Sequence, residues 1–393
     1  MRIAVIGSGI AGLASATHLS RAGHDVTIFE RFETPQPVGA GLLLQPSGLA
    51  ALDTLGLRSE AERRGARVSR LIGRTPKGRP VLDLRYADGK PGDIGIGIHR
   101  ASLFTLLHDA ARDSGAAWRA GSGVAEVADM EGAPRLILET GEATEAFDLA
   151  IVSDGAHSHL RHAVCPNARE HLYPWGAVWA IRPDPDGVRD GELDQVYDGC
   201  RIMIGLLPVG DNPADPQGRP GVSFFWSLRT DALPAWRAAG LEAFKAQVAQ
   251  LWPRASAAIA DVEDADAFAP AKYRDGVCPD WRRGNTILIG DAAHAMSPQL
   301  GQGANLALCD AAALAEALKD HAPLTRALPA FEADRRPATT YYTLMSRALT
   351  PVFQSGSRVI GWLRNLLMPL GCRLPGIRNW MAWTLAGRGR VPW

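Results

Sequence analysis

The sequence lacks the features that would place it at once among nucleic-acid-binding or membrane-spanning proteins. Its 42 Lys and Arg residues balance its 42 Asp and Glu residues, so charge gives no case for nucleic acid or another polyanionic partner. Its apolar runs are far shorter than the roughly 18 residues that a membrane-spanning helix needs. The N-terminus, MRIAVIGSG, has the pattern of a strand and a turn rather than of a signal peptide. We therefore expect a cytoplasmic protein.

Paired cysteines are also missing. The five cysteines are scattered, with no CxxC pair, which is typical of reduced thiols rather than of a disulfide or zinc framework. Three histidines do lie close together, at His157, His159 and His162. A zinc site needs further convergent ligands, and no second cluster of Cys or His supplies them. We interpret the histidines as turn and helix residues and predict no metal.

The first 30 residues contain a βαβ pattern. An apolar strand is followed by GSGIAG, a helix pattern, and a second strand that ends in Glu30. In such a unit Gly7 permits the turn, Gly9 lets a pyrophosphate approach the backbone, and Gly12 lets helix and strand pack closely. Glu30 lies 18 residues after Gly12, where an acid can accept hydrogen bonds from a ribose. A glycine-rich turn without a ligand is the alternative, which the placement of strand, helix and acid disfavours.

A second informative stretch covers residues 285–310, NTILIGDAAHAMSPQLGQGANLALCD. Its apolar run is typical of a buried parallel strand, after which Gly290 lets the chain turn and Asp291 emerges at the strand's carboxyl end. Ligands bind at that end in open α/β sheets. A helix that begins near Gly301 would direct free backbone N–H groups and a partial positive charge toward the preceding loop.

The middle of the chain has a different pattern. An apolar run ends in Asp154-Gly155, and an amphipathic helix is predicted over residues 102–113, with Ser102 as its N-cap.

Residues 171–268 then show short alternating segments between Pro, Gly and Asp turns, which predict an antiparallel sheet. Its aromatic residues fit a sheet core on one face and a substrate cavity on the other. They are Trp175, Trp179, Phe224, Phe225 and Trp226.

The C-terminal tail, residues 349–393, combines leucines, tryptophans and arginines with no acidic residue. A basic amphipathic tail of this kind can lie on a membrane surface. We favour a tail that covers the protein's own core or a dimer partner, and leave open a peripheral membrane contact, as well as the choice between monomer and homodimer.

Three motifs occur together in a characteristic order: GSGIAG with Glu30-Arg31, DGAHSHLR from Asp154, and GDAAHAMSPQLGQGAN from Gly290. Over residues 1 to about 345 they resemble the class A single-component FAD-dependent aromatic hydroxylases, which are flavoprotein monooxygenases related to salicylate and para-hydroxybenzoate hydroxylases. Two departures are Ser47, where the family commonly has asparagine, and Cys309, where an acid is frequent.

The resemblance and the segment patterns together imply an α/β fold. We expect a Rossmann-like FAD-binding domain with a mixed parallel sheet, an antiparallel-sheet substrate domain and a C-terminal helical tail. The predicted ranges are 1–70, 95–170 and 270–345 for the FAD-binding domain, 71–94 and 171–269 for the substrate-binding domain, and 346–393 for the tail.

The resemblance also implies roles for individual residues. Glu30 would anchor the adenosine ribose, Asp291 would accept from the ribityl hydroxyls, and Pro298 would lie beside the isoalloxazine. Backbone N–H groups at the last motif would face the flavin N1–C2 edge, where reduced flavin is negative and a helix N-terminus stabilises an anion. Asp154, Gly155 and Arg161 match a motif shared between FAD and transient NAD(P)H. The full set of predicted cofactor contacts is Gly7, Gly9, Ile10, Ala11, Gly12, Glu30, Arg31, Arg100, Asp154, Gly155, Arg161, Gly290, Asp291, Pro298, Gly301, Gln302, Gly303, Ala304 and Asn305.

The implied reaction uses FAD, with NADPH or NADH as the transient reductant, and O2 to hydroxylate a small aromatic or phenolic substrate through a flavin C4a-hydroperoxide. Because the cofactor carries this chemistry, no catalytic residue is assigned. A substrate-activating base could be His99, Tyr173, Tyr197 or Asp198, and none is preferred. The alternatives are a Baeyer–Villiger or epoxidising flavin monooxygenase acting on a non-aromatic substrate, and a FAD-bearing redox or binding module without oxygenation.

Overall fold

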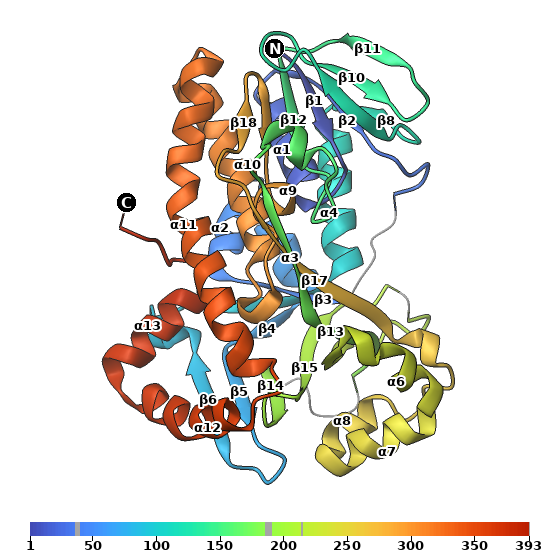
Figure 1. Cartoon of the computed structure of the whole chain (residues 1–393), viewed down its shortest axis with the longest axis vertical. Coiled ribbons are helices and arrows are strands. Elements are labelled where there is room, and N and C mark those ends of the chain that lie inside the picture. The colour runs from blue at the N-terminus through green and yellow to red at the C-terminus, as the bar shows by residue number, and fades with distance from the viewer. Residues whose placement is uncertain (36–39, 185–190, 214, 393) are drawn as a thin grey trace.

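The computed structural model describes residues 1–35, 40–184, 191–213 and 215–392. It is a mixed α/β structure built on two large sheets (Figure 1). The parallel sheet and its helices form the upper part of the view, the mainly antiparallel sheet lies below, and two C-terminal helices lie at the lower left. This arrangement confirms the predicted fold class, whereas the exact domain boundaries stay a prediction.

The first sheet has six strands in the order β18-β19-β12-β1-β2-β8, parallel except for β18. The strands are β1 (Arg2–Ile6), β2 (Asp25–Phe29), β8 (Ala117–Arg119), β12 (Leu149–Val152), β18 (Arg282–Arg283) and β19 (Thr286–Leu288). The apolar run of β12 is buried throughout, as is typical of a parallel strand that is covered on both faces.

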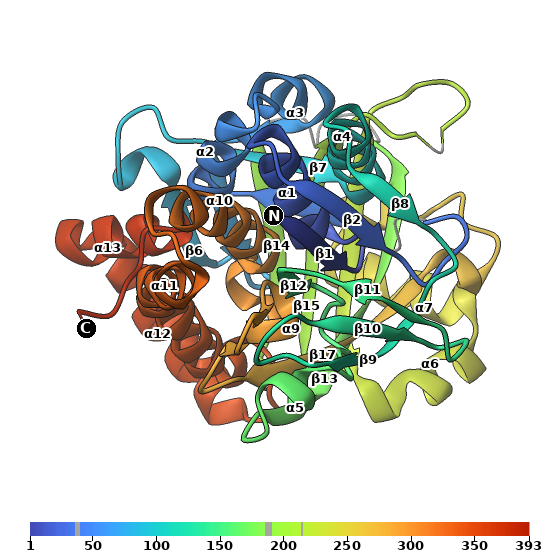
Figure 2. The same cartoon turned by 90° about the horizontal axis from the view of Figure 1, so that it is seen from above.

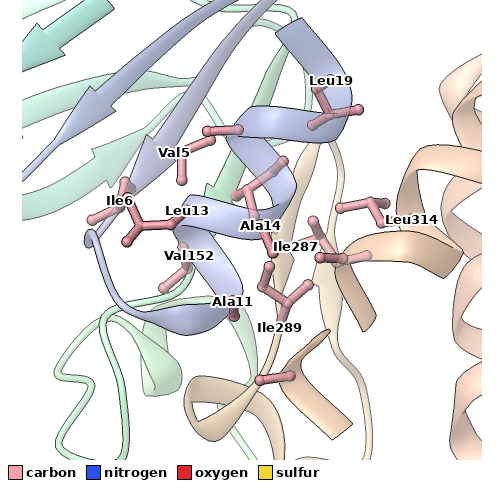
Figure 3. Packing of buried hydrophobic residues seen from close by; sticks show 14 of the residues in the cluster. Val5, Ile6, Ala11, Leu13, Ala14, Leu19, Val152, Ile287, Ile289 and Leu314 are labelled. Atoms are coloured by element: carbon pink, nitrogen blue, oxygen red, sulfur yellow. The ribbon is translucent and has the colours of Figure 1, made fainter. Parts of the chain in front are cut away.

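Four helices lie on one side of this sheet in the view from above (Figure 2). They are α1 (Ile10–Arg21), α2 (Pro46–Thr54), α4 (Arg100–Asp113) and α10 (Gly303–Asp320). Leu13 and Ala14 of α1 lie among Val5, Val152 and Ile287 of the sheet (Figure 3). These apolar contacts place the N-terminus of α1 at the carboxyl end of β1.

The second sheet has seven strands in the order β17-β13-β16-β15-β14-β5-β6. Neighbours are antiparallel except for β14 and β5. The strands are β5 (Arg70–Arg74), β6 (Pro80–Arg85), β13 (Arg169–Pro183), β14 (Glu192–Asp198), β15 (Ile202–Gly210), β16 (Gly221–Arg229) and β17 (Ala269–Val277). The predicted antiparallel sheet is confirmed, although β14 was not predicted from the sequence.

The two faces of this sheet separate its aromatic residues, as the alternation predicted. Phe224 and Trp226 pack against Phe244 of α7 (Leu241–Leu251). Trp179 and Phe225 stack on each other at 5.0 Å between ring centroids, and strand geometry places Phe225 on the face opposite Phe224.

Shorter elements connect these layers. β3 (Gly41–Leu44), β7 (Gly95–His99) and β4 (Ala66–Val68) form an antiparallel sheet, as do β9 (Val124–Ala128), β10 (Arg135–Leu138) and β11 (Ala143–Ala146). Gly41 N donates to Ser223 Oγ at 3.2 Å, so β3 is attached to β16 of the second large sheet. The remaining helices of this part of the chain are α3 (Arg58–Arg64), α5 (Arg161–Val164), α6 (Leu233–Ala239), α8 (Pro253–Ala258) and α9 (Asp291–His294), with the 3-10 turns η1 (Tyr86–Asp88), η2 (Thr230–Ala232), η3 (Ala265–Ala267) and η4 (Pro298–Leu300).

The C-terminal part consists of α11 (Leu324–Phe353), α12 (Arg358–Arg373) and α13 (Pro375–Leu385). Cys372 and Leu385 join the apolar cluster of β5 and β6, and Tyr342 Oη donates to Thr384 O at 2.7 Å. The tail therefore covers part of the chain's own core, as favoured from the sequence. Among the described residues, every helix is too short or too polar to cross a bilayer.

Two predicted helix starts were wrong by two residues. α4 begins at Arg100 because Nδ1 of His99 accepts from Ala101 N at 3.0 Å and caps the helix; Ser102, the predicted cap, is buried inside it. α10 begins at Gly303 rather than near Gly301, because Gly301 (φ +61°) terminates the 3-10 turn η4.

Candidate functional site

The candidate site lies where four parallel strands end. β1, β2, β12 and β19 point the same way, so the loops that follow them meet at one edge of the sheet. Hydrogen bonds join these loops: Gly7 N donates to Phe29 O at 2.8 Å, and Ser153 Oγ donates to Ile6 O at 2.9 Å. The predicted motifs are therefore brought together although they are far apart in the sequence.

The glycines of the first loop have different reasons to be glycine. A Cβ on Gly12 would lie 2.0 Å from Gly7 O, and one on Gly7 (φ +97°) would lie 2.8 Å from Ser153 O. The protein itself excludes side chains at both positions. At Gly9, by contrast, the nearest atom to a Cβ would be Ser153 O at 3.9 Å. The space beside Gly9 is open, as the approach of a ligand group to the backbone requires.

This loop also begins α1 with unpaired donors. Leu13 N is the first to close a helical hydrogen bond, to Gly9 O at 2.9 Å, and no described residue accepts from the N–H groups of Ile10, Ala11 and Gly12. These donors and the helix dipole favour an anion at this end of α1.

Glu30 fastens the same loop to β2. Its Oε2 accepts from Ser8 N at 2.9 Å and from Ser8 Oγ at 2.6 Å, while Oε1 accepts from Phe32 N at 3.0 Å. Two carboxylate oxygens can accept roughly four hydrogen bonds, so capacity remains for a further donor. Arg31 is exposed beside it, and its guanidinium lies 4.6 Å from the ring centroid of Phe32.

The loop after β12 presents an unsatisfied carboxylate. Both oxygens of Asp154 are buried, and neither forms a hydrogen bond with a described residue. Burial raises the pKa of this carboxyl above its ordinary value. A buried acceptor without a donor costs free energy, which a ligand with hydroxyl or N–H donors would recover. Gly155, which follows, has φ +89°.

Arg161 lies inside the protein, unlike the exposed residue Arg31 beside Glu30. It is fully buried, donates to Ala292 O at 2.7 Å and to Asp291 O at 2.9 Å, and forms an ion pair with Glu170. These bonds tie the loop after β12 to α9. The geometry favours a structural role for Arg161, and its predicted contact with a dinucleotide stays a prediction.

The loop after β19 is held by a buried charge cluster that was not predicted from the sequence. Gly290 N donates to Asp310 Oδ2 at 3.0 Å, His294 Nε2 lies 2.6 Å from the same oxygen, and Arg335 Nε donates to Oδ1 at 2.9 Å. Burial alone would raise the pKa of the Asp310 carboxyl, but His294 and Arg335 hold it below its ordinary value. The signal that could have found this cluster is an aspartate inside the apolar pattern of α10.

This cluster positions Asp291. Gly290 turns with φ +58°, and a Cβ there would lie 2.9 Å from that of Ala11. Asp291 is exposed, and its Oδ1 lies 3.6 Å from the place of a Cβ on Gly303. The predicted ribityl acceptor thus adjoins both the first loop and the start of α10.

The start of α10 offers four free donors. Gly301 N is already used, since it donates to Pro298 O at 3.0 Å. The N–H groups of residues 302–305 have no acceptor in the described part of the chain. Asn305, fully buried, accepts from Gln45 N at 2.8 Å and donates to Gly301 O at 2.9 Å, which fixes the turn. The predicted anion-stabilising edge therefore comprises Gln302, Gly303, Ala304 and Asn305, next to the exposed Pro298.

Arg100 lies at the start of α4, and its side chain is exposed. Its backbone N–H donates to Ala40 O at 3.3 Å, but its guanidinium forms no hydrogen bond or ion pair within the described ranges. Of the predicted contacts, Arg100 is the one whose orientation the protein leaves least constrained.

Two further polar groups lie near the loop that contains Pro298. Tyr173 Oη and Asp275 Oδ1 are buried, and neither meets hydrogen-bond geometry with a described residue, although Asp275, Ser297 and Thr350 lie close enough to the Tyr173 hydroxyl to affect its pKa. Asp275 Oδ2 accepts from Arg347 Nε at 2.6 Å. Burial and the neighbouring Asp275 raise the pKa of Tyr173 to about 12. The Ser297 and Thr350 hydroxyls, 2.9 Å apart, also lie here. Sequence reasoning considered Tyr173 but missed Asp275.

Two of the other conceivable bases, His99 and Tyr197, are engaged elsewhere, whereas no hydrogen bond or ion pair within the described residues engages the carboxylate of Asp198. His99 caps α4, and Tyr197 Oη donates to Gln195 Oε1 at 2.8 Å within a buried cluster.

Of the three clustered histidines, His159 bonds through Nε2 to Val124 O at 2.8 Å. Across the described residues, no group of three His, Cys, Asp or Glu side chains could hold a metal ion.

Comparison with known proteins identifies this arrangement of loops. Residues 1–343 match the model of a family described as an FAD binding domain. A 2-heptyl-3-hydroxy-4(1H)-quinolone synthase of Pseudomonas aeruginosa is 27% identical over 384 residues, which are 94% of each chain. A 3-amino-4-hydroxybenzoate 2-monooxygenase of Streptomyces platensis, PtmB3, is 31% identical over 343 residues, covering 81% of this chain and 79% of the relative.

The fold has a counterpart among solved structures. HpxO of Klebsiella pneumoniae, solved in complex with FAD and uric acid, superposes with a TM-score of 0.82 at 22% identity, covering 98% of this chain and 97% of that one. At this identity the similarity establishes the shared fold.

Proposed function

The chain belongs to the FAD binding domain family of flavoprotein monooxygenases, and from this premise we propose that it hydroxylates a small aromatic molecule with O2 and NAD(P)H. The kinship supplies the reaction class and the cofactor. The substrate, the choice of nicotinamide and the role of each side chain belong to the proposal.

The observation that supports the proposal most strongly is a set of polar groups without hydrogen-bond partners, together with the open space beside Gly9. The carboxylate of Asp154 lacks a donor, the N–H groups of residues 302–305 lack acceptors, and the backbone at Gly9 is open. FAD carries hydroxyl donors on its ribose and ribityl chains, a pyrophosphate anion and a ring edge with acceptors. The missing partners are thus those that FAD would supply.

Within this proposal the N-terminus of α1 and the backbone at Gly9 bind the pyrophosphate. Glu30 accepts from the adenosine ribose. Asp291 and Asp154 accept from hydroxyls of the cofactor's sugar chains. Both residues adjoin the first glycine loop, where the pyrophosphate would bind. The N–H groups of residues 302–305 then stabilise negative charge at the N1–C2 edge of the flavin ring, because a helix N-terminus carries a partial positive charge. When bound, the flavin supplies the electron transfer and oxygen activation.

The substrate is proposed to bind on the side of Pro298 that faces Tyr173 and Asp275. Their oxygens would accept from or donate to a polar substituent of the ring, and the hydrogen bond from Arg347 Nε holds the Asp275 carboxylate in place. The Tyr173 pKa, raised to about 12, keeps its hydroxyl protonated at neutral pH, so that it acts as a hydrogen-bond donor and not as a base.

The test is product formation by FAD-loaded enzyme. Salicylate, para-hydroxybenzoate, 3-amino-4-hydroxybenzoate and a 2-alkyl-4(1H)-quinolone would be incubated with NADH or NADPH, and both the oxygenated product and H2O2 would be measured. We expect one aromatic compound to accelerate NAD(P)H oxidation and to gain a hydroxyl group. Conversion of only ketones or alkenes would favour the Baeyer–Villiger or epoxidising alternative, and H2O2 without product would favour a redox module.

A further inference from the structure

The two C-terminal helices present their apolar stripe to the outside. In a surface helix the apolar residues at positions i, i+3, i+4 and i+7 ordinarily face the core. In α12 they are exposed: Val359, Trp362, Leu363, Leu366, Leu367 and Leu370. Trp362 is 65% exposed and Leu367 57%.

The side of α12 that faces the protein has no leucine or tryptophan: besides Met368 and Cys372, which pack on the apolar clusters beneath, its inward residues are small or charged. Gly361 packs against Cys200, and Arg364 is buried, where it donates to Gly199 O at 2.8 Å and lies over the ring of Tyr197. Burial lowers the pKa of Arg364 below its ordinary value. The helix is thus inverted relative to an ordinary surface helix, so its leucine and tryptophan stripe is not explained by packing within the chain.

The stripe continues onto α13. Ile377, Trp380 and Trp383, spaced by three, are each between 44% and 48% exposed. A Cβ on Gly371 of α12 would lie 3.4 Å from Ile377, so the two helices adjoin at their connection. Figure 1 shows them together at the lower left, outside both sheets. We call this continuous apolar surface of α12 and α13 the outer face.

The charges that the tail itself carries are all positive. Residues 349–393 contain arginines but no Asp or Glu. Arg378 and Arg388 are paired with Asp88 and Asp93, whereas Arg358 and Arg373, exposed at the two ends of α12, form no ion pair with a described residue. Two unpaired cations thus flank the exposed leucines and tryptophans.

This combination fits one occupant. An apolar face with tryptophans and flanking arginines matches the interfacial region of an anionic bilayer, where leucines enter the acyl boundary and arginines meet phosphates. A second copy bound through the same face would bring no acidic residue of its own tail to pair these arginines, because residues 349–393 contain none. α12 is also too short to span a bilayer, because 16 residues extend about 24 Å, and it contains Pro369.

We propose that the outer face of α12 and α13 docks the enzyme onto anionic lipid surfaces, with both helices lying in the plane of the interface. This role is independent of the proposed reaction, because it concerns the face of the tail opposite the one that packs on the chain.

The test is binding of FAD-loaded, full-length protein to vesicles by flotation. Phosphatidylcholine vesicles with phosphatidylglycerol are expected to carry the wild-type protein, and vesicles of phosphatidylcholine alone to bind it at least about tenfold more weakly. Raised salt should weaken the first interaction, since it screens the arginines. The double variant Trp362→Glu/Leu366→Glu should bind at least about tenfold more weakly. Leu172→Glu, an equally exposed position on β13, should bind as wild type.

A second variant, Arg358→Glu/Arg373→Glu, keeps the apolar stripe and should lose the preference for phosphatidylglycerol. Flavin content and thermal unfolding of each variant establish that it is folded. The proposal is overturned if wild-type protein floats with neither vesicle, if both double variants float as well as wild type, or if wild-type protein forms a dimer that the Trp362→Glu/Leu366→Glu variant dissolves. The last result would assign the outer face to a second copy of the chain.

Discussion

Replacing Gly9 by alanine should separate cofactor binding from folding. Gly9 has φ −75° and is the N-cap of α1, so alanine is sterically compatible with its backbone. Apart from the glycine's own chain neighbours, the added methyl meets no atom of the described residues closer than 3.9 Å. Loss of chain entropy in the unfolded state favours alanine by about 0.4–1 kcal/mol, and poorer N-capping opposes it by a similar amount. The stability of the FAD-free protein should therefore hardly change.

The same methyl would occupy the space through which a pyrophosphate reaches the backbone. A hydrogen bond to a charged group contributes about 1.5–3 kcal/mol, and its loss would weaken FAD binding by about 10- to 150-fold. Gly12→Ala is the matched comparison, because its methyl would lie 2.0 Å from the backbone oxygen of Gly7. Overpacking of this kind costs about 1–3 kcal/mol and should lower the unfolding midpoint of the FAD-free protein by roughly 1–4 °C, because the unfolding entropy of a chain of this length is large.

The assay is titration of FAD-free protein with FAD, followed by quenching of flavin fluorescence, together with thermal unfolding monitored by circular dichroism. The reasoning is refuted if Gly9→Ala binds FAD as tightly as wild type. It is refuted equally if FAD-free Gly9→Ala unfolds as early as Gly12→Ala, because the open space beside Gly9 would then have no functional meaning.

Three further predictions concern carboxylates and a hydroxyl of the same site. Asp291→Ala should weaken FAD binding about 10- to 100-fold with an unchanged unfolding midpoint, since Asp291 is exposed; unchanged FAD retention would remove its role as an acceptor. Asp154 has a raised pKa in the FAD-free protein, and donors on FAD favour the charged form of its carboxyl. The affinity of the wild-type protein for FAD should therefore be full above that pKa and fall as the pH drops through it. In the same FAD titrations Asp154→Asn should bind more weakly at neutral pH with a flatter profile, and a parallel profile would assign the titration to another group. Tyr173→Phe should raise KM about 2- to 10-fold with FAD affinity unchanged, and an unchanged KM in steady-state assays would place its hydroxyl outside the substrate site.

The sequence was sufficient for the parallel sheet and its turns because local rules determine them. Gly7, Gly12 and Gly290 are required by backbone conformation or by close packing, and these requirements are visible in the spacing of the motifs. The alternation around Phe224 and Phe225 likewise predicted which aromatic residues share a face.

Features that depend on long-range contacts were beyond sequence reasoning. The pairing of Asp310 with Arg335 joins two helices, and Asp275 meets Arg347 from a distant strand. The cap at His99 was missed because histidine is an uncommon N-cap. The outward orientation of the α12 stripe could not be inferred either, since its periodicity is the same whichever face the helix buries.

The central claim is that FAD held at the edge of the parallel sheet inserts one oxygen atom into an aromatic substrate. The most direct measurement is incubation of the FAD-loaded enzyme with NAD(P)H, 18O2 and the aromatic compound that most accelerates NAD(P)H oxidation, followed by mass spectrometry of the product. We expect a ring-hydroxylated product that carries one 18O atom. A product without 18O, or H2O2 as the sole oxygen product for every aromatic compound tested, would contradict it.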